Sequence, residues 1–205
     1  MTGPGLFIVL EGGDGAGKTT QARLLVDWLT RERGREVVRT FEPGDSLVGK
    51  QIRGLLLDPV WGDIDPRAEA LLYAADKAQH LFAVVRPALA KGAVVVSDRY
   101  VDSMLAYQGA GRVLAVDEVA TIARWATEDL RPDLTVLLDV DPDVAVHTKQ
   151  DQDRVEGAGE AFHQRAREGF LTLAEQDPDR YLVLPARDSV NRIAEQIRAR
   201  VDQLL

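Results

Sequence analysis

Residues 10–21 read LEGGDGAGKTTQ, and positions 12–19 match the pattern G-x-x-x-x-G-K-[ST] in full. The apolar run at 6–10 precedes this stretch, and residues 19–33 follow it with the apolar spacing of an amphipathic helix. A glycine-rich loop between a strand and a helix turns backbone amides toward phosphate oxygens and adds the positive end of the helix dipole. The sequence therefore predicts a phosphate-binding loop.

The chemistry of such a loop assigns roles to its residues. Lys18 is expected to reach the β- and γ-phosphates of ATP, and Thr19 is expected to ligate Mg²⁺. The residues expected to bind ATP are Gly12, Gly13, Asp14, Gly15, Ala16, Gly17, Lys18, Thr19 and Thr20. The loop alone does not name the reaction, because many unrelated enzymes and switches share it.

Short apolar runs alternate with longer amphipathic stretches along the chain. The runs at 6–10, 36–41, 92–97, 134–140 and 181–184 predict five strands. The stretches at 19–33, 65–91, 116–126, 161–174 and 190–205 predict helices, and Pro87 is expected to end or kink the second. Strands that are apolar on both faces indicate a covered parallel sheet. We expect an α/β, three-layer P-loop NTPase fold with a five-stranded parallel sheet, a single domain over 1–205 and a mobile lid over 143–159.

The composition narrows the classes of function. With 25 Lys+Arg against 33 Asp+Glu the net charge is −8, which argues against polynucleotide binding but not against small phosphate ligands. The absence of cysteine excludes a disulfide framework and Cys-ligated metal sites. No apolar stretch approaches the roughly 18 residues of a membrane span, and no basic residue precedes the run at 6–10. We therefore expect a cytoplasmic protein with no membrane partner.

Three classes of protein with this loop compete: a GTPase switch, a motor or transport ATPase, and a small kinase. The GTPase interpretation needs a guanine-reading motif directly after a strand, but TKQD at 148–151 lies well past the strand expected at 134–140. Asp98 and Arg99 follow the strand at 92–97, at the edge where nucleotides bind in such sheets. Asp98 can hold the magnesium ion, and the guanidinium of Arg99 suits a second phosphate. Two facing phosphate sites indicate a kinase whose acceptor is itself phosphorylated.

Several segments, in order and at family spacing, make the chain resemble the bacterial thymidylate (dTMP) kinases. They are LEGGDGAGKTTQARLL (10–25), FEPG (41–44), EALLYAADKAQH (69–80), SDRYVDSMLAYQGAGR (97–112), LTVLLDV (134–140), DRVEG (153–157) and FHQRAREGFL (162–171). The resemblance implies transfer of the γ-phosphoryl group of ATP to dTMP, with Mg²⁺ as cofactor. It also implies a homodimer.

The resemblance extends to residues outside the loop. Asp14 and Arg99 are expected beside the transferring phosphoryl group, together with Lys18. Glu42 is expected beside the acceptor, and Arg53 is expected on the acceptor phosphate with Arg99. The residues expected at the base and sugar are Tyr73, stacked on thymine, Tyr107, which crowds the sugar, and Gln108, a polar residue at the base.

Three positions depart from the family pattern. Lys77 stands where a base-contacting arginine is usual, and Met104 stands where a small polar residue is usual, so base selectivity is open. Between positions 144 and 153 the lid has no arginine, which leaves Lys149 and Arg154 as candidate catalytic cations. Where measured, an arginine finger is worth about 10³–10⁵ in rate. Two alternatives stay open: a kinase for another pyrimidine deoxynucleoside monophosphate, and a catalytically weakened nucleotide-binding homologue.

Overall fold

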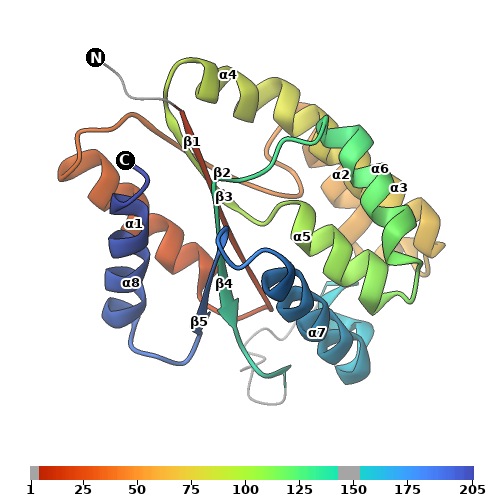
Figure 1. Ribbon diagram of the computed structural model, residues 1–205. Coiled ribbons are helices and arrows are strands. Elements are labelled where there is room, and N and C mark those ends of the chain that lie inside the picture. The colour runs from red at the N-terminus through yellow and green to blue at the C-terminus, as the bar shows by residue number, and fades with distance from the viewer. Residues whose placement is uncertain (1–4, 143–152) are drawn as a thin grey trace.

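The computed structural model describes residues 5–142 and 153–205. Five strands form one sheet: β1 (Leu6–Gly12), β2 (Val37–Phe41), β3 (Val94–Asp98), β4 (Leu134–Asp139) and β5 (Tyr181–Pro185). Every pair of neighbours is parallel and the order is β2-β3-β1-β4-β5, so β1 is central (Figure 1). The predicted five-stranded parallel sheet is confirmed.

Helices cover both faces of this sheet (Figure 1). On one face lie α1 (Lys18–Arg31) and α8 (Val190–Asp202). On the other lie α2 (Leu47–Leu57), α3 (Pro66–His80), α4 (Arg86–Ala90), α5 (Val101–Met104), α6 (Val116–Thr127) and α7 (Glu160–Gln176). Short 3₁₀ turns at Pro59–Trp61 and Glu156–Ala158, and π-helical turns at Leu81–Val85 and Leu105–Gly111, complete the described helices. No helix in the described parts of the chain is long and apolar enough to cross a membrane.

Alternate side chains of the central strand face two separate cores. Ile8 and Leu10 pack with residues of α1 and α8, while Phe7 and Val9 pack on the opposite face against the π-helical turn and α4. All four are at most 1% exposed. Because both faces are covered, the strand reads as a continuous apolar run rather than as an alternating one.

Two helical segments were not predicted from the sequence pattern. These are α2 and the run 101–111, which joins α5 to the second π-helical turn. Both contain glycines, which lower helix propensity by about 1 kcal/mol each. In α2 the tertiary contact explains one of them, because a Cβ at Gly49 would lie 2.5 Å from the Asp76 carboxylate. The start of α2 is fixed by Ser46, whose hydroxyl accepts a hydrogen bond from the Gly49 amide at 2.8 Å.

The helical run also continues through Pro87 and does not end there. The π-helical turn Leu81–Val85 immediately precedes α4, and the Arg86 amide bonds to the carbonyl of Leu81, five residues back. Pro87 is the second residue of α4, directly after the π-helical turn. The closing helix ends at Asp202 rather than at 205.

Gly12 lies where β1 meets the phosphate loop, and a substitution there tests how closely β1 packs against β4. Its φ is +133°, and a Cβ there would lie 2.3 Å from the Leu138 carbonyl oxygen of the neighbouring strand. We expect Gly12→Ala to lower the free energy of unfolding by roughly 3 kcal/mol or more, since backbone of a central strand cannot move aside. Chemical denaturation measures the change.

Gly54→Ala is the matched control, because that glycine is exposed in α2 and a Cβ there meets nothing within 4 Å. It should raise the free energy of unfolding by about 0.5–1 kcal/mol. Equal effects of the two substitutions would contradict the packing described at Gly12.

Candidate active site

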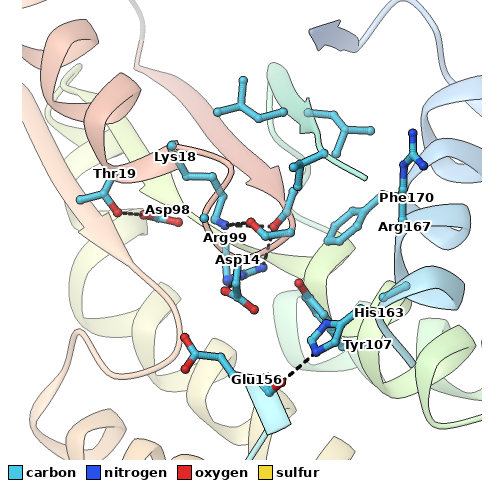
Figure 2. Close-up of a pocket in the computed structure, with 18 of the residues that line it drawn as sticks. Asp14, Lys18, Thr19, Asp98, Arg99, Tyr107, Glu156, His163, Arg167 and Phe170 are labelled. Carbon is cyan, nitrogen blue, oxygen red and sulfur yellow. Dashed lines mark hydrogen bonds and ion pairs between the residues drawn. The ribbon is translucent and has the colours of Figure 1, made fainter. Parts of the chain in front are cut away.

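The loop after β1 closes around the ammonium of Lys18 (Figure 2). Gly17 takes a left-handed conformation, with φ +91°, and is the N-cap of α1. Lys18 begins that helix, and its Nζ donates to the carbonyl oxygens of Gly12 at 3.0 Å and Gly13 at 2.8 Å. Burial lowers the pKa of Lys18 to about 8. The buried Lys18 ammonium and the amino end of α1 therefore lie at the same opening of the loop, and both favour binding of an anion there.

Thr19 and Asp98 meet beside this loop. The strand register sets Leu10 of β1 opposite Asp98 of β3, and the Thr19 hydroxyl donates to Asp98 Oδ2 at 2.8 Å. A hydroxyl and a carboxylate are the hard oxygen ligands that Mg²⁺ accepts, usually with waters and substrate phosphates filling its other positions. Among the described residues no cluster of three or more acidic, histidine or cysteine side chains forms a closed metal site. This pair fits an ion that arrives with a nucleotide.

Arg99 is held in a strained backbone conformation next to the same loop. Its φ is +74°, unusual for a residue with a side chain, and its amide donates to the Leu10 carbonyl at 2.9 Å. The guanidinium donates to the Gly12 carbonyl at 3.1 Å, to Ser103 Oγ at 3.0 Å and to Asp14 Oδ1 at 2.7 Å. The turn after β3 therefore delivers a second fixed cation to the phosphate loop.

Charges around Asp14 keep its carboxyl ionised. Burial alone would raise the pKa of Asp14, but the Arg99 guanidinium and the Lys18 ammonium outweigh burial and lower it. On its other side the Arg99 guanidinium lies 5.2 Å from the centre of the Tyr107 ring. The charges of Lys18, Arg99 and Asp14 therefore lie close enough to influence one another.

Beneath Arg99 lies Glu11, a fully buried carboxyl. It accepts hydrogen bonds from the amides of Tyr100 at 2.8 Å and Ser103 at 3.1 Å, and from Ser103 Oγ at 2.6 Å. Burial, reinforced by Asp102, raises the pKa of Glu11 to about 7. Through Ser103 this carboxyl is linked to the Arg99 guanidinium, so it holds the turn that carries the second cation. Sequence reasoning missed it, although an acid directly before the glycines is a recognisable signal.

One cavity of about 890 Å³ joins these parts (Figure 2). Its floor includes the phosphate loop with Thr19, Asp98, Arg99 and Tyr107. A second wall comes from β2 and α2, and a third from the end of β4 and from α7. The residues of the second wall are Arg39, Thr40, Phe41, Glu42 and Arg53, and those of the third include Asp139, Val140, Glu156, His163, Arg167 and Phe170. The volume lies in the upper part of the range usual for ligand pockets.

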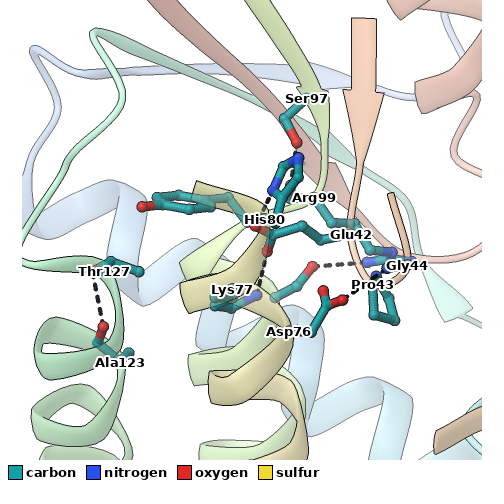
Figure 3. Close-up of polar contacts among 12 residues, drawn as sticks. Glu42, Pro43, Gly44, Asp76, Lys77, His80, Ser97, Arg99, Ala123 and Thr127 are labelled. Carbon is teal, nitrogen blue, oxygen red and sulfur yellow. Dashed lines mark hydrogen bonds and ion pairs between the residues drawn. The ribbon is translucent and has the colours of Figure 1, made fainter. Parts of the chain in front are cut away.

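The second wall carries a buried ion pair and a cation (Figure 3). Glu42 Oε2 accepts from Lys77 Nζ at 2.5 Å, with both side chains at most 2% exposed. Burial alone would raise the pKa of Glu42, but Lys77 and His80 lower it. Arg53 donates to the Pro43 carbonyl at 2.7 Å, which keeps its guanidinium on the cavity wall. Cations therefore line the second wall as well as the loop. This arrangement suits a cavity that binds two phosphate-bearing ligands.

Comparison with known proteins agrees with this geometry. The thymidylate kinase family model matches residues 10–197. A thymidylate kinase of Cutibacterium acnes is 60% identical over 201 residues, covering 98% of each chain, and one of Leifsonia xyli subsp. xyli is 54% identical over 203 residues, covering 97% of this chain and 95% of that one. The chain belongs to the thymidylate kinase family. A crystal structure of the Ehrlichia chaffeensis thymidylate kinase superposes with a TM-score of 0.81 at 30% identity, over 97% of this chain and 99% of that one. Family membership also excludes the interpretation of this chain as a GTPase switch, whose motif at 148–151 lies outside the described residues.

Within this thymidylate kinase fold the cavity brings together many of the residues singled out from the sequence. Lining the cavity are Gly12, Gly13, Asp14, Gly15, Gly17, Lys18, Thr19, Thr20, Glu42, Arg53, Asp98, Arg99 and Tyr107. Ala16 is buried in the core between the sheet and α1 instead.

Four predicted substrate residues lie behind that lining. Lys77 is paired with Glu42, and Met104 is 1% exposed in an apolar cluster between α3 and α6. The Gln108 amide donates to buried Glu69 at 3.1 Å, and half-buried Tyr73 packs against the cluster that contains Met104. Lys77 was expected at the base in place of an arginine, and in the structure Glu42 holds its ammonium.

Arg154 is bound to residues of α2 and α3. Its Nε donates to the Leu56 carbonyl at 3.0 Å, and its guanidinium pairs with Glu69, which also holds Arg112 through two bonds of 3.0 Å. Arg154 is not among the described residues that line the cavity. Lys149, the other candidate lid cation, lies outside the described residues.

Sequence reasoning did not assign His163 and Arg167 of α7 to the site. They are four residues apart, so they lie on one helical face, and both line the cavity (Figure 2). Arg167 makes two bonds to Asp139, at 2.8 and 3.0 Å, and one to Asp141 at 3.0 Å. His163 Nε2 lies 3.1 Å from the Glu156 carbonyl oxygen. The polar i, i+4 pair in FHQRAREGFL, flanked by buried Phe162 and Phe170, was the available signal.

Proposed function

We propose that this chain transfers the γ-phosphoryl group of ATP to dTMP and releases ADP and dTDP. The observation that carries the proposal is the position of Arg99. Its guanidinium stands between the phosphate loop, through Gly12 and Asp14, and the open cavity that Arg53 and Glu42 line from the opposite side. One fixed cation can therefore touch both the donor and the acceptor phosphates.

On the donor side, the amides of residues 13–19 and the Lys18 ammonium would hold the β- and γ-phosphates. Thr19 and Asp98, already in contact at 2.8 Å, would hold Mg²⁺. When bound, that ion would offset negative charge on the transferring phosphoryl group. The chain's own part is to position the nucleotide and to supply cations that need no rearrangement during the reaction.

On the acceptor side, Arg53 and Arg99 would bind the phosphate, and Glu42 would face the sugar end of the acceptor. The buried Tyr107 hydroxyl has no hydrogen-bond partner among the described residues and lies at the cavity, which suits a contact with the sugar. We assign Tyr73 and Gln108 to the thymine end. Met104 shapes that end from the apolar cluster, and Lys77 acts by neutralising Glu42 rather than by touching a base.

The transfer itself needs little covalent chemistry from the protein. An oxygen of the acceptor phosphate attacks the γ-phosphorus while the bond from that phosphorus to the ADP oxygen breaks in line. The acceptor oxygen is already largely ionised near neutral pH, so no strong general base is required. Lys18 and Arg99 offset the charge of the equatorial oxygens, and Asp14 orients Arg99.

We propose that residues 1–205 form a single domain with a lid at 143–159. Lys149 is proposed as a further catalytic cation from this lid. Arg154 is proposed to attach the lid to Glu69.

A panel of nucleoside monophosphates with ATP and Mg²⁺ tests the substrate. Fast, selective turnover of dTMP is expected, and chelation of Mg²⁺ should abolish it. Arg53→Met should raise the KM for dTMP at least about tenfold, since a charge-assisted bond to phosphate is lost, and leave the KM for ATP within about twofold.

Arg23→Met is the control, because that arginine lies on the exposed face of α1, where it pairs with Asp27. It should change neither KM. Preference for another monophosphate, or ATP binding without turnover of any acceptor, would contradict the proposed reaction.

We also propose that the enzyme is a cytoplasmic homodimer that associates through α3 and α6. The side chains of Leu71, Phe82 and Trp125 are 55%, 76% and 83% exposed, and a shallow apolar groove runs between Leu71 and Trp125. Exposed apolar area of this kind is typical of an interface. Thr121 is the one polar residue among the described residues that line the groove, and none of them is charged. This apolar lining supports a contact with the same surface of a second copy.

Sedimentation velocity tests the dimer. Trp125→Glu should convert it to monomer at micromolar concentration, because a carboxylate buried at an apolar interface has no partner. Trp61→Glu, at an exposed tryptophan elsewhere on the surface, should leave the dimer intact. A monomeric parent chain, or a dimer that survives Trp125→Glu, would contradict the assignment.

A further inference from the structure

His80, a fully buried residue at the end of α3, braces the second wall of the cavity from behind (Figure 3). Its Nδ1 lies 2.7 Å from Glu42 Oε1, and its Nε2 lies 2.5 Å from Thr40 Oγ1. Both Thr40 and Glu42 line the cavity, whereas His80 does not. One imidazole therefore contacts two wall residues, one through each ring nitrogen.

The hydrogen bonds around His80 determine how many protons its imidazole must carry. A threonine hydroxyl has one proton, and Thr40 places it on Asp45 Oδ2 at 2.7 Å, so toward His80 its oxygen can only accept. Glu42 takes the Lys77 ammonium on its other oxygen at 2.5 Å, and its pKa is lowered, so this carboxylate also only accepts. Each ring nitrogen of His80 must then carry a proton to complete both bonds.

The surrounding charges favour the same state. Three carboxylates belong to this network: Glu42, Asp45 and Asp76. Burial and Glu42 raise the pKa of Asp76 to about 6, so it is mostly ionised at neutral pH. Among the cations, the Lys77 ammonium pairs with Glu42 and lies 5.9 Å from the centre of the Tyr100 ring, and the Arg53 guanidinium bonds to the Pro43 carbonyl beside them. Tyr100 itself stays neutral, because burial raises its pKa. A cation on His80 offsets part of the excess negative charge, against the cost of its burial.

We propose that His80 is a positioning residue that works as a buried imidazolium and holds Thr40 and Glu42 in place for the acceptor nucleotide. Loss of either ring proton would set a nitrogen lone pair against an oxygen lone pair, so one of the two bonds would open. The acceptor wall would then loosen while the phosphate loop stays unchanged. The KM for dTMP should therefore depend on the protonation of His80, with little change in kcat or in the KM for ATP.

Nitrogen NMR of the parent protein tests the protonation state without any assay of activity. The chain has three histidines, so the His80 ring signals can be assigned by their loss in His80→Gln. Two protonated ring nitrogens on His80 at pH 7 are expected. A single protonated nitrogen would overturn the proposal.

Kinetics between pH 6 and 9 test the positioning role. In the parent protein the KM for dTMP should rise about tenfold across the titration that NMR assigns to His80. In His80→Gln, whose amide cannot donate to both partners, this KM should be about tenfold higher at low pH and should lose that step. The phosphate of dTMP titrates in both proteins, so the difference between the two profiles isolates the residue.

A purely structural role would lower kcat and both KM values together with thermal stability. That pattern, or a His80→Gln profile that superposes on the parent profile, would overturn the proposal. The substrate panel above is measured on the parent protein, so failure of the proposed reaction would be seen there and is distinguishable from failure of this inference.

Discussion

The pairing of β1 with β3 is the constraint on which the site depends. It sets Leu10 opposite Asp98, and the Arg99 amide continues the ladder by donating to the Leu10 carbonyl at 2.9 Å. Two turns that are far apart in the sequence then share one edge of the sheet. Thr19 can reach Asp98 at 2.8 Å, and the Arg99 guanidinium can reach Gly12 and Asp14. The strained φ of Arg99 is tolerated because these contacts on both sides fix it.

Buried carboxylates organise the rest of this acidic chain. Glu11 holds the turn that carries Arg99, Glu42 joins Lys77 and His80 behind the acceptor wall, and Glu69 gathers Gln108, Arg112 and Arg154. Each of the three is at most 3% exposed. A buried charge is tolerated only with partners, so each of these acids fixes the groups around it. The net charge of −8 therefore coexists with a cavity lined by fixed cations.

Much of the fold and the loop could be predicted because local signals there agree with the tertiary structure. Five apolar runs and one glycine motif were enough to place the sheet and Lys18. Where tertiary contacts override local propensity, prediction failed, as for Gly49 of α2, which makes room for Asp76. The acceptor side was harder, because a position in a family pattern does not say where a side chain points. Lys77 and Arg154 show this, since each is paired with a buried carboxylate that the sequence pattern did not indicate.

A linked ligand tests most directly whether one cavity holds both nucleotides with Arg99 between them. In such a ligand a chain of phosphates joins adenosine and thymidine through their 5′ positions, and calorimetry with Mg²⁺ gives its affinity. The structure predicts one site per chain and binding at least about 100-fold tighter than that of ATP or dTMP alone, because the second contact becomes intramolecular. Binding no tighter than that of ATP, or displacement by ATP but not by dTMP, would contradict the shared cavity.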